Sequence, residues 1–75
     1  MNNARRKWLK DVISSLEYAR DELDFLAEEE ERAYDNLPDN IKDSEKGNII
    51  YENVDVLQTA ASDIADILDS ITEIV

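Results

Sequence analysis

Apolar residues recur in alternating steps of three and four along the first half of the chain, once position 30 is counted. That spacing is the heptad pattern of a helix that packs against another helix. Glu30 is the only polar interruption, and Ile13, Ala27 and Tyr34 widen the stripe along one flank. The pattern predicts a helix over about residues 3–36. Its predicted core-facing residues are Leu9, Val12, Leu16, Ala19, Leu23, Leu26, Ala33 and Leu37.

The second half repeats the pattern with no polar interruption, and Ala60, Ile67 and Ile74 broaden the stripe. It predicts a helix over about residues 44–74, with the Ser44 hydroxyl capping the first turn. A strand is excluded because alternation with a period of two is absent. The predicted core-facing residues are Ile50, Val54, Leu57, Ala61, Ile64, Leu68, Ile71 and Val75.

The only proline and the only glycine lie close together between these two stripes. Pro38 cannot continue a helix and restricts the residue before it, so the first helix is predicted to stop there. The short connector is predicted to form one tight helical turn that places Ile41 against the end of the hairpin. Gly47 costs about 1 kcal/mol relative to alanine inside a helix, so we expect it to permit a close approach, by Tyr34 or Ala33. The hinge is assigned to Tyr34, Leu37, Pro38, Ile41, Ser44 and Gly47.

A short connector makes the two helices run antiparallel, which predicts an all-α fold, a two-helix hairpin forming a single domain over residues 1–75. Folding the chain about Asn40 predicts three facing pairs, namely Leu23 with Leu57, Ala19 with Ala61, and Leu16 with Ile64. The same register sets the basic first turns against the acidic end of the second helix, which puts Arg5, Arg6, Lys7 and Lys10 beside Asp66, Asp69 and Glu73.

Length and charge narrow the class of protein. A chain of 75 residues without cysteine is marginally stable alone, so assembly into a helical-bundle homo-oligomer, a dimer or larger, is expected. The formal net charge of −11 disfavours nucleic acid and anionic membranes as partners, so a charged partner should be basic. No stretch reaches the ~20 apolar residues of a membrane span and the N-terminus lacks the apolar segment of a signal peptide, so a cytoplasmic protein is expected.

The residues offer no constellation typical of catalysis or metal binding. Histidine and cysteine are both absent, which removes the commonest general base and the commonest metal ligands. The acidic connector does not fit a calcium loop, because Leu37 and Ile41 occupy ligand positions and the central glycine is missing. We therefore expect a protein that is not an enzyme and that binds no metal or cofactor.

Four aromatic residues suggest an interaction surface. Tyr18 and Phe25 lie one heptad apart and away from the core-facing stripe, and Trp8 and Tyr51 join them on neighbouring faces. A single intramolecular partner cannot cover such a strip. It is predicted to be either a self-association surface or a docking site for a foreign protein.

Two charged features have structural explanations. The basic cluster at residues 5–7 could bind phosphate, but the acidic end of the second helix offers it counter-charges within the chain. Glu30 falls on the core-facing stripe, and its carboxylate is expected to meet a tyrosine hydroxyl, Tyr51 or Tyr34, or Arg32 of a neighbouring chain.

At the hinge the chain carries an aromatic-Asp-Asn-Leu-Pro stretch, residues 34–38, followed by a Ser-Glu-x-Gly turn, residues 44–47. This combination resembles small helical-hairpin proteins of bacteriophages and prophages that have no established activity, and the likeness covers nearly the whole chain. The connector departs from them, with Asn40, Ile41 and Lys42 in place of a more usual Ser, Leu and Gln. The resemblance implies an origin in a mobile element and the cytoplasm of a bacterial host. Small acidic helical phage proteins include inhibitors of host defence and oligomeric scavengers of nucleotide signals, which suggests such roles by analogy.

Three functions follow as hypotheses. The first is a non-catalytic oligomer that inhibits or titrates a host protein, with a DNA-mimic variant that uses the acidic surface. The second is a sponge for a nucleotide signal, with stacking on Tyr34 or Tyr51 and anion contacts from Arg20, Arg32, Lys42 and Lys46. The third is a purely structural or assembly role.

Overall fold

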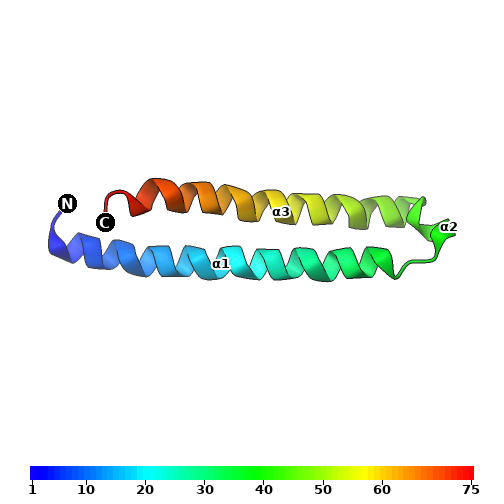
Figure 1. Cartoon of the computed structure of the whole chain (residues 1–75), viewed down its shortest axis with the longest axis horizontal. Helices are drawn as coiled ribbons and strands as arrows, with labels where there is room; N and C mark the ends of the chain where they lie inside the picture. The colour runs from blue at the N-terminus through cyan, green and yellow to red at the C-terminus, as the bar shows by residue number, and fades with distance from the viewer.

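The computed structural model describes all 75 residues, which form a long helical hairpin (Figure 1). Helix α1 spans Asn3–Asp35, the single-turn helix α2 spans Asp39–Lys42, and helix α3 spans Glu45–Thr72. α1 and α3 run antiparallel and pack along their length, with α2 at the turn between them. The predicted all-α hairpin is confirmed, and its two long helices end within two residues of the predicted bounds.

The hinge follows from local chemistry. The carbonyl oxygen of Pro38 accepts hydrogen bonds from the last two amides of α2, at 2.8 and 3.1 Å, which closes that turn. Leu37 and Ile41 are half-buried, and α2 packs against α3. The Ser44 hydroxyl accepts a hydrogen bond from the Gly47 amide at 3.4 Å and so caps α3, as predicted.

Gly47 is buried, but its neighbours are not the ones predicted. A Cβ at this position would lie within 3.0 Å of the backbone carbonyl oxygens of Lys42 and Ile41. The close approach is therefore made by the backbone of α2, and not by Tyr34 or Ala33. The first turn of α3 contains glycine because the connector folds directly against it.

The side of α1 that faces α3 differs from the predicted stripe. Val12 and Leu26, predicted to lie in the core, point outward with 40% and 49% of their surface exposed. At every second position of the predicted stripe, the residue that faces α3 is instead the next one along the chain, which turns Arg20 toward α3. The inward residues of this half of the chain are Leu9, Ile13, Leu16, Arg20, Leu23, Ala27, Glu30, Tyr34 and Leu37, and Ala19, which flanks them, is half-buried as well. On α3 the predicted stripe holds from Ile50 to Ile71, whereas Val75 is exposed.

The two helices pair about one turn away from the predicted register. The Asn53 amide donates a hydrogen bond to Glu30, and the rings of Tyr34 and Tyr51 lie 5.6 Å apart. The predicted register instead sets Glu30 beside Ile50. Continuing the observed register along both helices gives two layers in which an alanine faces a leucine, Ala27 opposite Leu57 and Ala61 opposite Leu23. Alanines in these layers let the helices approach closely, which agrees with the burial of both of them.

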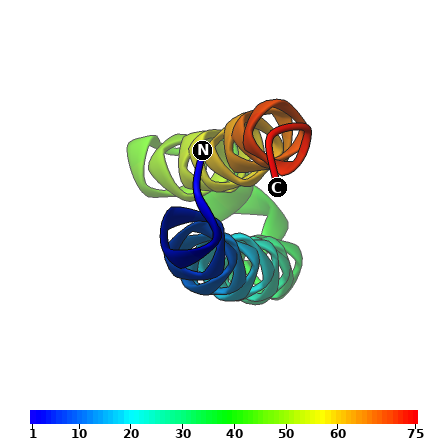
Figure 2. The same cartoon turned by 90° about the vertical axis from the view of Figure 1, so that its left-hand side faces the viewer.

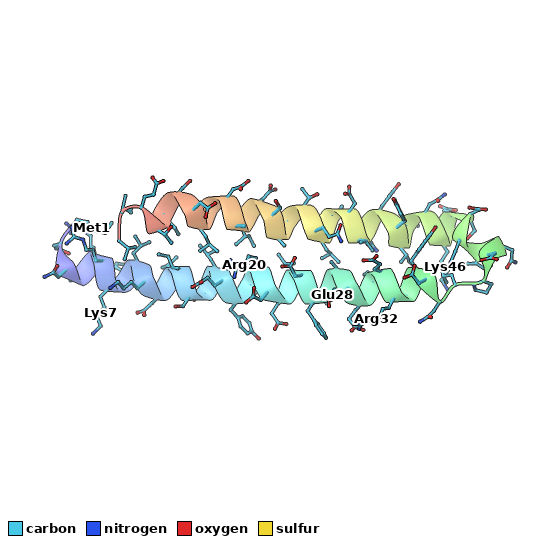
Figure 3. The ribbon with its side chains drawn as sticks, viewed as in Figure 1. Met1, Lys7, Arg20, Glu28, Arg32 and Lys46 are labelled. Carbon is cyan, nitrogen blue, oxygen red and sulfur yellow. The ribbon has the colours of Figure 1, made fainter.

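The basic first turns of α1 are not neutralised by α3, contrary to the prediction. Both salt bridges of the molecule lie within α1, joining Arg20 to Asp21 at 3.1 Å and Arg32 to Glu29 at 2.6 Å. α1 reaches past the end of α3 (Figure 1), and Lys7 points away from it (Figure 3). The first turn is held instead by an unpredicted cap, since the side chain of Asn2 accepts a hydrogen bond from a backbone amide of that turn at 2.9 Å.

The hairpin is thin. Its Cα atoms span 59 × 15 × 12 Å, and a view along the long axis shows α1 and α3 packed side by side with no further layer (Figure 2). Only four of the 75 residues are buried, namely Ala27, Gly47, Ala61 and Leu68. A core of this size stabilises a fold by less than about 5 kcal/mol. Most apolar side chains of the chain are therefore left in contact with solvent.

Candidate functional site

The surface of the hairpin divides into two broad faces, one on each side of the seam between α1 and α3. We call the inward residues of each helix its inward column. In an antiparallel pair, the positions that flank this column on one helix lie beside the equivalent flanking positions of the other helix. Two shallow cavities show which flanking positions of α1 share a side of the hairpin with which positions of α3. A cavity of about 380 Å³ on one side is lined by Leu26, Glu30, Asn53, Val56 and Leu57. A cavity of about 350 Å³ on the other side is lined by residues that include Glu31, Tyr51 and Asp55.

We call the side of Leu26 and Val56 the apolar face. From α1 it takes the flanking positions Trp8, Val12, Ala19, Leu26 and Ala33. From α3 it takes the flanking positions Ile49, Val56, Ala60, Ile67 and Ile74. The seven large side chains among them are 40–70% exposed. The charged residues at the same heptad positions are few and of both signs, Arg5, Glu22, Glu29, Lys46 and Asp63.

We call the opposite side the acidic face. Eight carboxylates occupy its flanking positions, against only two lysines, Lys7 and Lys10. Three of them, Glu31, Asp35 and Asp55, line the cavity on this side together with Glu52. The eight residues of the acidic face are Glu17, Asp21, Asp24, Glu28, Glu31, Asp35, Asp55 and Asp69.

Aromatic side chains occupy the hinge end of the acidic face. The ring of Tyr34 packs edge-on against that of Tyr51, with 5.6 Å between the ring centres. The Lys42 ammonium lies over the Tyr34 ring, 5.6 Å from its centre, which is the geometry of a cation–π contact. Both rings line the cavity that the carboxylates line. The hinge thus presents a concave surface that favours cationic rather than anionic groups.

The four aromatic residues predicted to form an interface do not share one patch. Tyr51 belongs to the hinge cluster, whereas Trp8 lies near the chain termini on the apolar face. Tyr18 and Phe25 lie on the side of α1 directly opposite the seam, 69% and 56% exposed. These two remain together as predicted, and with the carboxylates around them they form what we call the outer stripe of α1.

The four predicted anion contacts are spread along the molecule and do not converge on a site. Arg20 lies between the two helices (Figure 3), and its Nε and Nη2 atoms both donate to Asp21. Arg32 donates to Glu29, and Lys42 is placed over Tyr34. Lys46 lies on the apolar face, away from the cavity of the acidic face. No arrangement of these side chains forms a cradle for a phosphate within one chain.

Glu30, the polar residue of the seam, has a partner that the sequence did not identify. Its Oε2 atom accepts a hydrogen bond from the Asn53 side-chain amide at 3.3 Å, rather than from the predicted hydroxyl of Tyr51 or Tyr34. Asn53 flanks the inward column of α3 on the apolar face. The pair joins the two helices and is the one side-chain hydrogen bond between them.

No three acidic side chains converge in a geometry that could hold a metal ion. None of the helices combines the length and apolar character needed to cross a bilayer. No protein-family model, curated protein or solved structure matches the chain.

Proposed function

We propose that the chain is a non-enzymatic binding protein that titrates a partner protein through the outer stripe of α1. The observation that carries the proposal is the exposure of Tyr18 and Phe25 on the side of α1 that α3 leaves uncovered. Aromatic side chains are enriched among the residues that dominate binding energy. Two of them one heptad apart on a rigid helix present a preorganised ridge, which lowers the entropic cost of binding.

The surroundings of the two rings indicate the chemistry of the partner. Phe25 has carboxylates at both three and four residues before and after it, and Tyr18 shares the first pair of these. The four neighbouring residues are Asp21, Glu22, Glu28 and Glu29. A matching surface is an apolar groove rimmed by lysine or arginine side chains, because complementary charge fixes orientation and speeds association.

The proposed partner is a protein of a bacterial host, such as a defence factor. The support for this is the resemblance at residues 34–38 and 44–47 to bacteriophage and prophage proteins. Self-association of the hairpin is part of the proposal, because a chain with four buried residues gains stability from further burial. A purely structural role would use the same self-association without the outer stripe.

The acidic face supports a second candidate, mimicry of nucleic acid. Its eight carboxylates lie on one side of the hairpin, mostly along α1, where a basic nucleic-acid site would attract them. A nucleotide sponge is less well supported, since the cavity beside Tyr34 and Tyr51 is lined by Glu31, Asp35 and Asp55, which repel phosphate.

The experiment that tests the proposal uses the immobilised protein as bait in a lysate of a candidate host, with the captured protein identified and then purified for titration. Replacing both Tyr18 and Phe25 by serine should weaken binding by at least about 30-fold, as expected when two aromatic anchors are lost. Tyr51→Ser removes a similarly exposed aromatic residue that lies outside both the outer stripe and the apolar face, and it serves as the matched control.

The dependence of affinity on salt concentration distinguishes docking through the outer stripe from mimicry of nucleic acid. Docking through the aromatic ridge predicts that affinity changes less than about tenfold between 50 and 500 mM NaCl, whereas mimicry predicts a steep loss. If the double variant binds as tightly as the wild type and salt abolishes binding, the acidic face is the functional surface. If the double variant binds normally at every salt concentration, the outer stripe has no role in binding.

A further inference from the structure

We propose that the apolar face is the interface of an antiparallel homodimer, in which a second copy of the chain covers it. The inference rests on the self-association included in the proposed function and names the surface that produces it, which adjoins the outer stripe at Glu22 and Glu29 but does not cover Tyr18 and Phe25. Seven large hydrophobic side chains lie on this one face and are half-exposed or more exposed in the single chain. They come from both helices and occupy the two heptad positions that flank the inward residues on this side, so each helix carries a second apolar stripe.

The dimensions of the face fit a second copy. The broad side of the hairpin measures 59 by 15 Å. This is roughly 900 Å² of projected surface, close to the ~800 Å² per partner that a stable interface buries. A second hairpin laid on this face matches its length and width, and two hairpins stacked in this way make a four-helix bundle with one continuous core.

Charge selects this face over its opposite. The acidic face carries eight carboxylates and two lysines at flanking positions, so that stacking two acidic faces would bring many like charges together. The apolar face carries three acidic and two basic residues at its equivalent positions. Dimerisation through the apolar face leaves both acidic faces, and both outer stripes of α1, in solvent.

Charge also selects the antiparallel arrangement. Residues 28–46, at the hinge end, carry eight carboxylates and three basic side chains. The other end is close to neutral, because the basic residues Arg5, Arg6, Lys7 and Lys10 are balanced there by the acidic residues Asp11, Asp66, Asp69 and Glu73. A parallel dimer stacks one acidic hinge on the other, whereas an antiparallel dimer lays each acidic hinge against the near-neutral end of the partner and so reduces the repulsion.

The side chains of the face are complementary to themselves under this symmetry. In the observed register, a two-fold axis that crosses α1 between Glu22 and Leu23 crosses α3 between Ala61 and Ser62. On α1 the axis sets large residues against small ones, Leu26 against the partner's Ala19 and Val12 against the partner's Ala33. On α3 it sets branched residues together, Val56 against the partner's Ile67 and Ile49 against the partner's Ile74.

Light scattering tests whether the face is the interface. The wild type should have twice the 8.6 kDa chain mass at micromolar concentration. Val56→Ser combined with Ile67→Ser should raise the dimer dissociation constant at least about 100-fold, because four apolar side chains per dimer lose their burial. The control, Tyr18→Ser with Phe25→Ser, should keep the dimer mass. A monomeric wild type, or a dimer that the Val56 and Ile67 changes leave intact, overturns the proposal.

Single cysteines test the orientation, since the natural chain contains none. Glu22→Cys lies on the apolar face beside the two-fold axis, so mild oxidation should link two chains through this position in the antiparallel dimer. The matched control, Glu28→Cys on the acidic face, should remain unlinked. In a parallel dimer the two copies of position 22 lie at opposite edges of the bundle. Failure of Glu22→Cys to cross-link within an intact dimer therefore overturns the antiparallel arrangement.

Discussion

Gly47 shows how one residue fixes the geometry of the hinge. It lies within α3 and its φ is negative, so its backbone conformation does not require glycine. Glycine is required there for space, since the carbonyl groups of α2 occupy the place that a Cβ would take. The sequence predicted a close approach at this position, but it could not identify α2 as the neighbour, because the path of a connector is not encoded in heptad spacing.

We predict that Gly47→Ala destabilises the protein by about 1–3 kcal/mol, the usual cost of overpacking. Helix propensity alone predicts the opposite, a gain of about 1 kcal/mol, so the sign of the effect decides between the two. Urea unfolding at fixed protein concentration measures it. The control is Asn48→Ala, one residue later and exposed, which should be neutral or slightly stabilising. An alanine at position 47 that stabilises the fold would mean that α2 does not pack against it.

Each long helix was predictable to a different degree. On α3 every inward position from Ile50 to Ile71 is apolar, so one stripe stands out and the structure uses it. α1 offers two competing columns, one through Val12, Ala19, Leu26 and Ala33 that is apolar from residue 12 to residue 33, and one that contains Arg20. The sequence favours the first, but the structure turns the second toward α3. Choosing between them requires knowledge of the facing surfaces, which periodicity along one helix does not contain.

The same ambiguity explains which parts of the candidate site could be predicted. The outer stripe was predictable, because Tyr18 and Phe25 point away from α3 whichever of the two columns of α1 packs against it. The apolar face was not, because Val12 and Leu26 had been assigned to the core. An apolar column that remains unused within the hairpin is what gives one side of the molecule its apolar character.

Glu30 is the polar interruption of the α1 seam, and we predict that Glu30→Leu stabilises the hairpin by about 1 kcal/mol. The change replaces one long hydrogen bond to Asn53 with apolar contact in a half-buried position. Urea unfolding of the variant and of Glu31→Leu, its exposed neighbour, separates a seam effect from a loss of net charge. Destabilisation by Glu30→Leu would show that the Glu30–Asn53 pair holds the register, as a single polar seam residue can.

Charge acts at the scale of the whole molecule. The chain has a net charge of −11 and only two salt bridges, so repulsion among carboxylates opposes folding. We predict that raising NaCl from about 10 to 500 mM stabilises the protein by roughly 1 kcal/mol, seen as a rise of up to ~1 M in the urea midpoint. Glu28→Gln with Glu31→Gln should raise the low-salt midpoint and reduce the gain from salt. A midpoint that falls with salt would mean that attractive ion pairs outweigh the repulsion.

The proportions of the hairpin determine how it moves through solution. A rod about four times as long as it is wide meets more friction than a sphere of equal mass, so its diffusion is slow for its size. Stacking a second hairpin on the broad face doubles the mass and thickens the short 12 Å dimension, while the 59 Å length stays the same. Retention on a sizing column depends on friction, so the apparent mass of one chain will be larger than its true mass. The increase in apparent mass from one chain to the dimer will be smaller than the true doubling.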